Sequence, residues 1–406
     1  MLLLAGPGLL AGEEPLLPDA VLDTIRDAPT GNANRTQRLE ELFVQAGAPA
    51  ASIRRQPISR GSDEVNVWTV LPGTLEDEPT IVVGAHTDAM DGSPGVIDNW
   101  TSCVMLAALC GELRGLELRH TFLLIGFAGE EHGRCGSRAF LGGTGRPLRS
   151  RMRAMVNLEC LGVGRLRSWA NRSADDLEAL LEASAAEAGM PVGSQVLFGY
   201  TADSVSFHRA GIPSMTIHSL PAPMLSVINT SADDGRHLDM DRYREAHRLL
   251  TAFLLRLDRH QAPLTLANRQ AEYRPVRNSV LAQVRAVPPE AEAASSGVRL
   301  EQVLPDTPEF VAGLRPGDVV TAINGHAVTR VDEVRQVLNT LYRGHPVSVE
   351  VCRPVRPVNP HLLISPWGGP VEDGPLPEAP RFALANRPAA PETADDNGLL
   401  LVTVEY

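Results

Sequence analysis

The stretch Thr121-Phe-Leu-Leu-Ile-Gly-Phe-Ala-Gly-Glu-Glu-His-Gly-Arg-Cys-Gly-Ser137 decides the fold of this chain. Its apolar first half, bounded by turn residues, is typical of a β-strand that is buried on both faces. Two adjacent carboxylates, Glu130 and Glu131, follow this run. Because ionised carboxylates are costly to bury, the pair marks the point where the strand leaves the core.

Three other apolar runs end in residues that can bind metal. These are residues 81–85 before His86-Thr-Asp88, residues 153–158 before Glu159, and residues 213–217 before His218. Ligands of open α/β sheets bind beyond the carboxyl ends of the strands. We therefore expect these side chains to meet at one edge, together with Asp98, which opens a predicted helix over residues 98–113.

Helical and strand patterns alternate from residue 81 to about residue 260, which predicts an α/β domain with a mostly parallel, mixed sheet flanked by helices. Short strands separated by turns follow, and they indicate a second, small β-rich domain. The predicted divisions are residues 1–17 as a signal remnant or disordered start, 18–260 as the α/β domain, 261–276 as a linker, 277–355 as the β-rich domain, and 356–406 as a Pro/Gly-rich tail that could add a terminal strand.

Composition excludes some classes of protein. The formal charge of −12, without a cluster of basic residues, argues against nucleic acid as a partner. No run approaches the roughly 20 apolar residues of a transmembrane helix. Residues 1–12 resemble the later part of a secretory signal, so we predict export to the periplasm, cell envelope or medium, with the cytoplasm left open. The five cysteines form no C-x-x-C pair, which favours buried thiols over a disulfide framework.

Five segments resemble, in order and spacing, the zinc-dependent aminopeptidases of the M28 peptidase family. They are His86-Thr-Asp88, Ile97-Asp-Asn99, Gly129-Glu-Glu-His-Gly-Arg-Cys-Gly-Ser137, Asn157-Leu-Glu159 and Phe207-His-Arg-Ala-Gly-Ile-Pro213. The Gly-Glu-Glu segment is the most specific of them. The resemblance covers roughly residues 18–257 and implies a zinc exopeptidase fold.

The resemblance also implies a role for each matched residue. Glu130 would be the general base, and Asp88 would orient the imidazole ring of His86 without binding the metal itself. The implied metal ligands are His86 and Glu159 for one ion, Glu131 for the other, and Asp98 as a bridge between them. Asp203 falls where the family has an aspartate near the substrate pocket.

Three positions depart from the family pattern. Glu159 stands where aspartate is usual, and Ser204 where histidine is frequent. Asn229 occupies the ligand position of the closing His-Thr-x-x-Asp motif, and an amide oxygen is a weaker ligand than imidazole. We therefore predict one tightly bound zinc ion and a second site that is weak or empty, with His218, His237 and His132 as substitute ligands to consider.

The β-rich domain resembles a PDZ domain. The resemblance rests on residues 307–320 and on the hairpin signal Asn324-Gly325. PDZ domains bind chain ends by adding a strand to a sheet edge. A peptide or protein partner is therefore one prediction for this domain, although its glycine-rich carboxylate loop is not evident. A packing or regulatory role is the alternative.

These patterns predict a metal-dependent exopeptidase that hydrolyses N-terminal residues of peptides. Two alternatives stay open. One is a weak or inactive pseudo-peptidase that binds peptides through the PDZ-like domain. The other is a one-metal acyl-transfer enzyme that resembles the glutaminyl cyclases.

Overall fold

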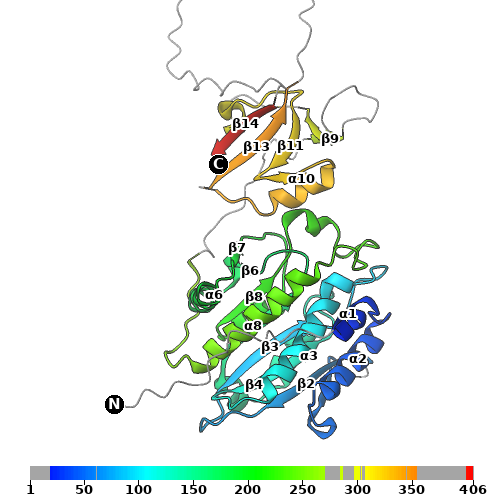
Figure 1. The fold of residues 1–406 in the computed structure, drawn as a ribbon, viewed down its shortest axis with the longest axis vertical. Helices are drawn as coiled ribbons and strands as arrows, with labels where there is room; N and C mark the ends of the chain where they lie inside the picture. Colours follow the sequence, from blue (N-terminus) through cyan, green and yellow to red (C-terminus); the bar gives the residue numbers. More distant parts are fainter. Residues whose placement is uncertain are drawn as a thin grey trace, which may run out of the picture. The chain divides into compact units, whose positions relative to one another are not determined.

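The computed structural model describes residues 19–60, 62–269, 284–286, 297–301, 303, 307–343, 345–353 and 399–405. The chain separates into two compact units, residues 1–273 and 274–406 (Figure 1). The predicted signal remnant and residues 356–398 of the predicted tail lie outside the described residues, as do residues 270–276 of the predicted linker.

The first unit is built on a mixed sheet of eight strands, which confirms the predicted fold class. In sheet order they are β1 (Arg54–Pro57), β2 (Val65–Leu71), β4 (Thr121–Phe127), β3 (Thr80–His86), β5 (Met152–Glu159), β8 (Ser214–His218), β6 (Arg167–Trp169) and β7 (Gly193–Gln195). The strands β4, β3, β5 and β8 are mutually parallel. Their carboxyl ends therefore lie at one edge of the sheet.

Helices cover both faces of this sheet. They are α1 (Asp19–Arg26), α2 (Asn32–Gln45), α3 (Thr101–Arg114), α4 (Cys135–Gly143), α5 (Arg146–Arg151), α6 (Asp175–Glu187), α7 (Ser204–Arg209) and α8 (Met240–Arg259). Figure 1 shows α3 and α8 lying against the sheet and running along the strands. Alternate residues of β3 explain the layers: Ile81 and Val83 pack in the cluster with α3 and α8, whereas Val82 packs with Phe140 of α4 and Phe207 of α7.

The helix predicted from Asp98 begins later than expected. The regular helix α3 starts at Thr101, and the preceding turn, Val96–Trp100, has non-helical torsions at Asp98 (φ −111°, ψ 88°) and Asn99. The backbone amides of Ile97 and Asp98 donate to the carboxylate of Asp233 instead of to a helical partner. Asp98 is therefore not a helix cap, and its side chain is free for another role.

The second unit holds an antiparallel sheet in the order β14-β13-β11-β10-β9, with β12 paired to β11. Its strands are β9 (Val284–Ala286), β10 (Val298–Leu300), β11 (Val319–Ile323), β12 (His326–Ala327), β13 (Pro346–Cys352) and β14 (Leu399–Glu405), with helices α9 (Pro308–Ala312) and α10 (Val331–Leu338). Asn324 and Gly325 both have positive φ, 49° and 73°, as a two-residue hairpin turn requires. Within the described residues, no helix combines the length and the apolar character needed to cross a membrane.

Candidate metal centre

Three ligand-type side chains meet at the carboxyl edge of the first unit's sheet. Nε2 of His86 lies 3.0 Å from Oδ1 of Asp98 and 3.4 Å from Oε2 of Glu159, and one ligand atom from each lies within 4.8 Å of the others. His86 ends β3 and Glu159 ends β5, so the sheet itself fixes both positions. An imidazole nitrogen with two carboxylate oxygens around one point is a donor set that suits zinc.

The turn after β4 is tied to the imidazole by Asp88. The carboxylate of Asp88 accepts hydrogen bonds from the backbone amides of Glu130 and Glu131, each 3.0 Å long. Nδ1 of His86 lies 3.1 Å from the backbone carbonyl oxygen of Asp88 and 3.5 Å from its carboxylate. When Nε2 binds a metal, Nδ1 carries the ring proton and donates it toward Asp88. Asp88 thus orients the ring largely through its main chain, while its side chain holds the turn.

The carboxylate of Glu159 and the main chain at Asp98 are held by residues to which the sequence analysis assigned no role. The side-chain amides of Asn99 and Asn157 donate to Oε2 and Oε1 of Glu159, both at 2.8 Å. Asp233 orients the main chain at Asp98, as described above. Asn157 lies two residues before Glu159 on the same strand, so period-two alternation places both side chains on one face and could have revealed the contact. Asn99 and Asp233 lie in segments that match the family pattern, Asn99 directly after Asp98 and Asp233 as the aspartate of Asn229-Thr-Ser-Ala-Asp233, and that pattern was the available signal for them.

Arg35 of α2 holds the loop that joins His86 to Asp98. Its guanidinium donates to the carbonyl oxygens of Thr87 (2.6 Å), Pro94 (3.1 Å) and Gly95 (2.8 Å). The side chain is only 1% exposed. Sequence reasoning missed this residue, although an arginine on the otherwise apolar face of an amphipathic helix was a usable signal.

Glu130 and Glu131 lie beside the cluster with unsatisfied oxygen atoms. Oε1 of each is buried and has no hydrogen-bond partner among the described residues. Burial raises the pKa of Glu130 to about 10 and that of Glu131 to about 8. Although burial opposes it, the neighbouring carboxylates, Glu159 foremost, hold the pKa of His86 well above its usual value. A bound cation would stabilise the ionised form of these buried carboxyl groups, which burial otherwise keeps protonated.

A cavity of about 280 Å³ opens onto these residues. The ligand-type side chains His86, Asp98, Glu130, Glu131 and Glu159 line one part of it. Its other part is largely apolar, formed by Trp169, Leu197, Leu220, Leu225 and Ile228. This combination of an acidic end and an apolar wall suits a small molecule with one charged end and one apolar end.

The sequence offers Asn229 and three histidines for the ligand position at which the family pattern has histidine. These four residues differ in their burial and in whether they line the cavity. Asn229 lines the cavity but is exposed, has a left-handed backbone (φ 62°), and does not belong to the three-residue cluster. His218 is buried and lines the cavity. His132 and His237 are exposed and are not among the lining residues.

Asp203 lies near Glu130 without lining the cavity. Asp203 directly precedes α7, and its side chain makes no capping hydrogen bond to this helix. Within the described chain neither carboxylate oxygen has a hydrogen bond of good geometry, and burial raises the pKa to about 7 against the opposing effect of the Ser137 hydroxyl. Ser204 instead contacts Thr216, with 2.7 Å between the two hydroxyl oxygens.

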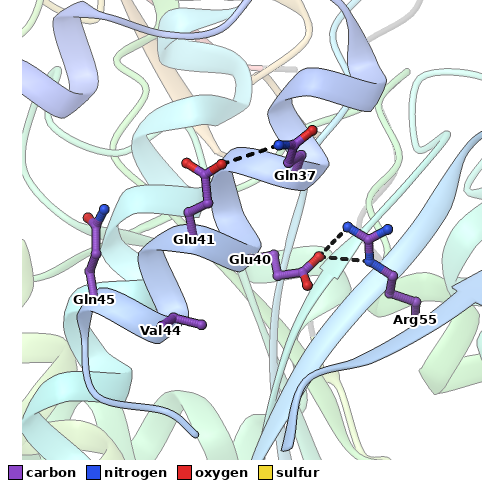
Figure 2. Close-up of a pocket in the computed structure, with 6 residues that line it drawn as sticks. All are labelled: Gln37, Glu40, Glu41, Val44, Gln45 and Arg55. Carbon is purple, nitrogen blue, oxygen red and sulfur yellow. Dashed lines mark hydrogen bonds and ion pairs between the residues drawn. The ribbon is translucent and has the colours of Figure 1, made fainter. Parts of the chain in front are cut away.

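A second hollow, on the outer surface between α2 and β1, is lined by Gln37, Glu40, Glu41, Val44, Gln45 and Arg55 (Figure 2). Glu40 and Arg55 form an ion pair there, and Gln37 bonds to Glu41. Four of the six lining side chains are thus paired with one another, and the lining includes no histidine or cysteine. We therefore assign it no role in chemistry.

The fold and the site together define a metallohydrolase type of protein, in which a mixed α/β sheet gathers imidazole and carboxylate groups at its carboxyl edge. Family comparison makes the assignment specific. Residues 66–254 match peptidase family M28, and residues 277–359 match the PDZ domain. The chain therefore contains an M28 peptidase domain followed by a PDZ domain.

Solved structures with this fold include aminopeptidases. LapA from Legionella pneumophila superposes with a TM-score of 0.51 at 20% identity, covering 60% of this chain and 73% of that one. The zinc aminopeptidase BSAP from Bacillus subtilis superposes with a TM-score of 0.45 at 21% identity, covering 52% of this chain and 54% of that one. At 20% identity, the similarity to LapA shows the fold alone.

The magnetosome formation protease MamE from Magnetospirillum gryphiswaldense is 33% identical over 98 residues. The matched stretch is 24% of this chain and 13% of MamE. The similarity therefore concerns a small part of either protein.

Replacing Arg35 by Met should weaken zinc binding by about 10- to 100-fold, the usual effect of losing a group that supports metal ligands. The loop carbonyl groups would lose their donor, and the distance between His86 and Asp98 would no longer be fixed. Zinc affinity can be measured by competition with a chelator. Arg38→Met on the same helix is the control, because the side chain of Arg38 hydrogen-bonds only to Glu41 among the described residues. A folded Arg35→Met protein with parental zinc affinity would limit Arg35 to a structural role.

The metal-free protein should lose stability between pH 7 and pH 8. In the folded protein, burial raises the pKa of Glu130 to about 10 and that of Glu131 to about 8, against the ordinary glutamate value of 4.5. The folded state therefore binds protons that the unfolded state has released, so stability falls as pH rises. The raised pKa of His86 acts in the same direction. His218 and His247, whose pKa values are lowered to about 3 and about 4 in the folded protein, are neutral in the folded and largely neutral in the unfolded state between pH 7 and pH 8, so they do not offset this loss.

The free energy of unfolding of the metal-free protein should fall by up to about 1.4 kcal/mol per pH unit for each proton that only the folded state retains. Chemical denaturation of metal-stripped protein at pH 7.0, 7.5 and 8.0 measures it. Excess zinc should flatten the slope, because bound metal lets the carboxylates ionise. Stability that increases over this interval would contradict the assignment of these protons.

Proposed function

We propose that the chain is a metal-dependent exopeptidase that removes N-terminal residues from peptides. The observation that supports this most is the convergence of His86, Asp98 and Glu159 beside Glu130, at the acidic end of a cavity with an apolar wall. Zinc fits the donor set, and Glu131 adds a buried carboxylate oxygen that lacks a partner among the described residues. We expect His86, Asp98 and Glu159 to hold the tightly bound ion.

In this proposal Glu130 is the general base. A bound zinc ion would lower the pKa of water toward about 7 and act as a Lewis acid. Glu130 accepts the proton of the attacking water and delivers it to the leaving amine. Asp88 fixes the main chain at Glu130 through the 3.0 Å hydrogen bond, so the base keeps its position during proton transfer.

The cavity supports a substrate with an apolar N-terminal residue. About 280 Å³ accommodates one side chain and little more. The carboxylates at its acidic end favour the α-ammonium group of a free N-terminus, and the wall of Trp169, Leu197 and Leu225 favours a side chain such as leucine. A free N-terminus held next to the hydrolytic centre is the requirement of an aminopeptidase.

One observation favours a one-metal acyl-transfer reaction as the second candidate. The three-residue cluster is compact, while Asn229 is exposed and outside it, so the described residues offer one strong site. The number of bound ions and the products formed separate the two functions. Export of the protein and peptide binding by the PDZ domain remain predictions.

A scan of aminoacyl p-nitroanilides tests the exopeptidase function. We expect hydrolysis, with leucyl substrate preferred over aspartyl and lysyl substrates by at least about tenfold in kcat/KM. Glu130→Gln should reduce turnover by about 10²- to 10⁴-fold and keep the zinc content, because it removes the proton acceptor and preserves the shape. Gln37→Glu, on the outer surface of α2, is the control and should match the parent. Parental activity in Glu130→Gln would remove Glu130 from the mechanism.

Titration of metal-free protein with zinc should show one tight equivalent. Asn229→His should raise this number toward two, because imidazole is a better zinc ligand than an amide and histidine tolerates the left-handed backbone. Elemental analysis after dialysis checks the count. Two tight equivalents in the parent, with one lost in His218→Ala or His237→Ala, would overturn the one-ion prediction.

A further inference from the structure

His218 is a buried polar residue that the mechanism above does not use. It ends β8, is 1% exposed, and pairs in register with Glu159 at the end of the neighbouring strand β5. It also lines the cavity, next to Glu159 in the sheet. The strand therefore delivers an imidazole to the place where a substrate would lie.

Hydrogen bonding fixes which ring nitrogen of His218 carries the proton. The backbone N–H of Leu220 donates to Nδ1 over 3.2 Å. A nitrogen that accepts a hydrogen bond has no proton of its own, so the ring is neutral and its proton is on Nε2. His218 thus presents an N–H group from Nε2.

This N–H group has no acceptor among the described residues, although the nitrogen is buried. A protonated Nε2 cannot be a metal ligand, which separates His218 from His86, whose Nε2 faces two carboxylates. Leaving a buried donor unpaired is costly. No described residue, polar residues of the lining included, accepts a hydrogen bond from Nε2, which leaves a molecule in the cavity as the acceptor to test.

We propose that His218 binds substrate by donating its Nε2–H to a carbonyl oxygen of the peptide held in the cavity. The inference rests on the proposed exopeptidase function and adds a hydrogen-bonding residue to it. The apolar wall holds the side chain of the N-terminal residue, the acidic end holds its ammonium group, and His218 orients the peptide group. A substrate without that carbonyl oxygen would lose this orientation.

Binding of leucyl-leucinamide to the zinc-loaded full chain tests the proposal. Glu130→Gln is used as the background, so that the peptide is not consumed during calorimetry. Two variants separate the functions of the ring. His218→Phe removes both nitrogen atoms, whereas His218→Asn keeps an oxygen near the position of Nδ1 for the N–H of Leu220 and loses the donor at Nε2. His208→Phe, on the exposed surface of α7, is the control.

We expect both His218 variants to weaken peptide binding by about tenfold, as for the loss of one hydrogen bond, and to keep the zinc content of the background protein. The control should bind like the background. Loss of zinc in His218→Phe would make His218 a ligand and overturn the proposal. Parental binding by His218→Asn would overturn it too, because the residue would then act only through Leu220.

The Glu130→Gln background protein distinguishes a failure of the exopeptidase function from a failure of the role proposed for His218. If it binds zinc but no leucyl-leucinamide, the exopeptidase function itself fails, and the role of His218 falls with it. If it binds the peptide and all variants bind equally well, only the role of His218 is overturned.

Discussion

The concentration of negative charge at one edge of a buried sheet is the constraint on which the rest of the first unit depends. Asp98, Glu130, Glu131 and Glu159 lie around a single cavity, and burial alone would keep several of them protonated. Coulomb repulsion between such groups is strong in a medium of low dielectric constant. Among the described residues, His86 and the nearby Arg35 offset part of this repulsion between carboxylates. A bound metal ion would offset the rest.

The surrounding residues show how such an edge is kept in place without the ion. Asn99 and Asn157 fix both oxygens of Glu159, Asp233 fixes the main chain before Asp98, and Arg35 fixes the loop that precedes it. Each of these groups gives up its hydration, and each is matched by a hydrogen bond of 2.7–2.8 Å. Preorganisation of this kind lowers the cost of assembling the ligands, and it places part of the stability of the fold in the site itself.

The sequence was sufficient for the strands and for most of the residues that they carry to the site edge. Long apolar runs closed by glycine or polar residues gave β3, β4, β5 and β8, whose parallel arrangement brings His86, Glu159 and His218 together. Very short elements such as β6 and β7 have too few residues for a periodic signal. The turn at Asp98 was predicted incorrectly because its conformation depends on Asp233, which lies 135 residues away in the chain.

The tie made by Asp88 has a consequence for motion at the site. One carboxylate holds the amides of Glu130 and Glu131, and the same residue contacts the ring of His86 through its carbonyl oxygen. The turn that carries the proposed base and the strand end that carries the proposed ligand are thereby joined through a single residue, and a displacement of one is transmitted to the other. Such a joint keeps the spacing between the proposed base and the proposed ligand constant when either segment moves.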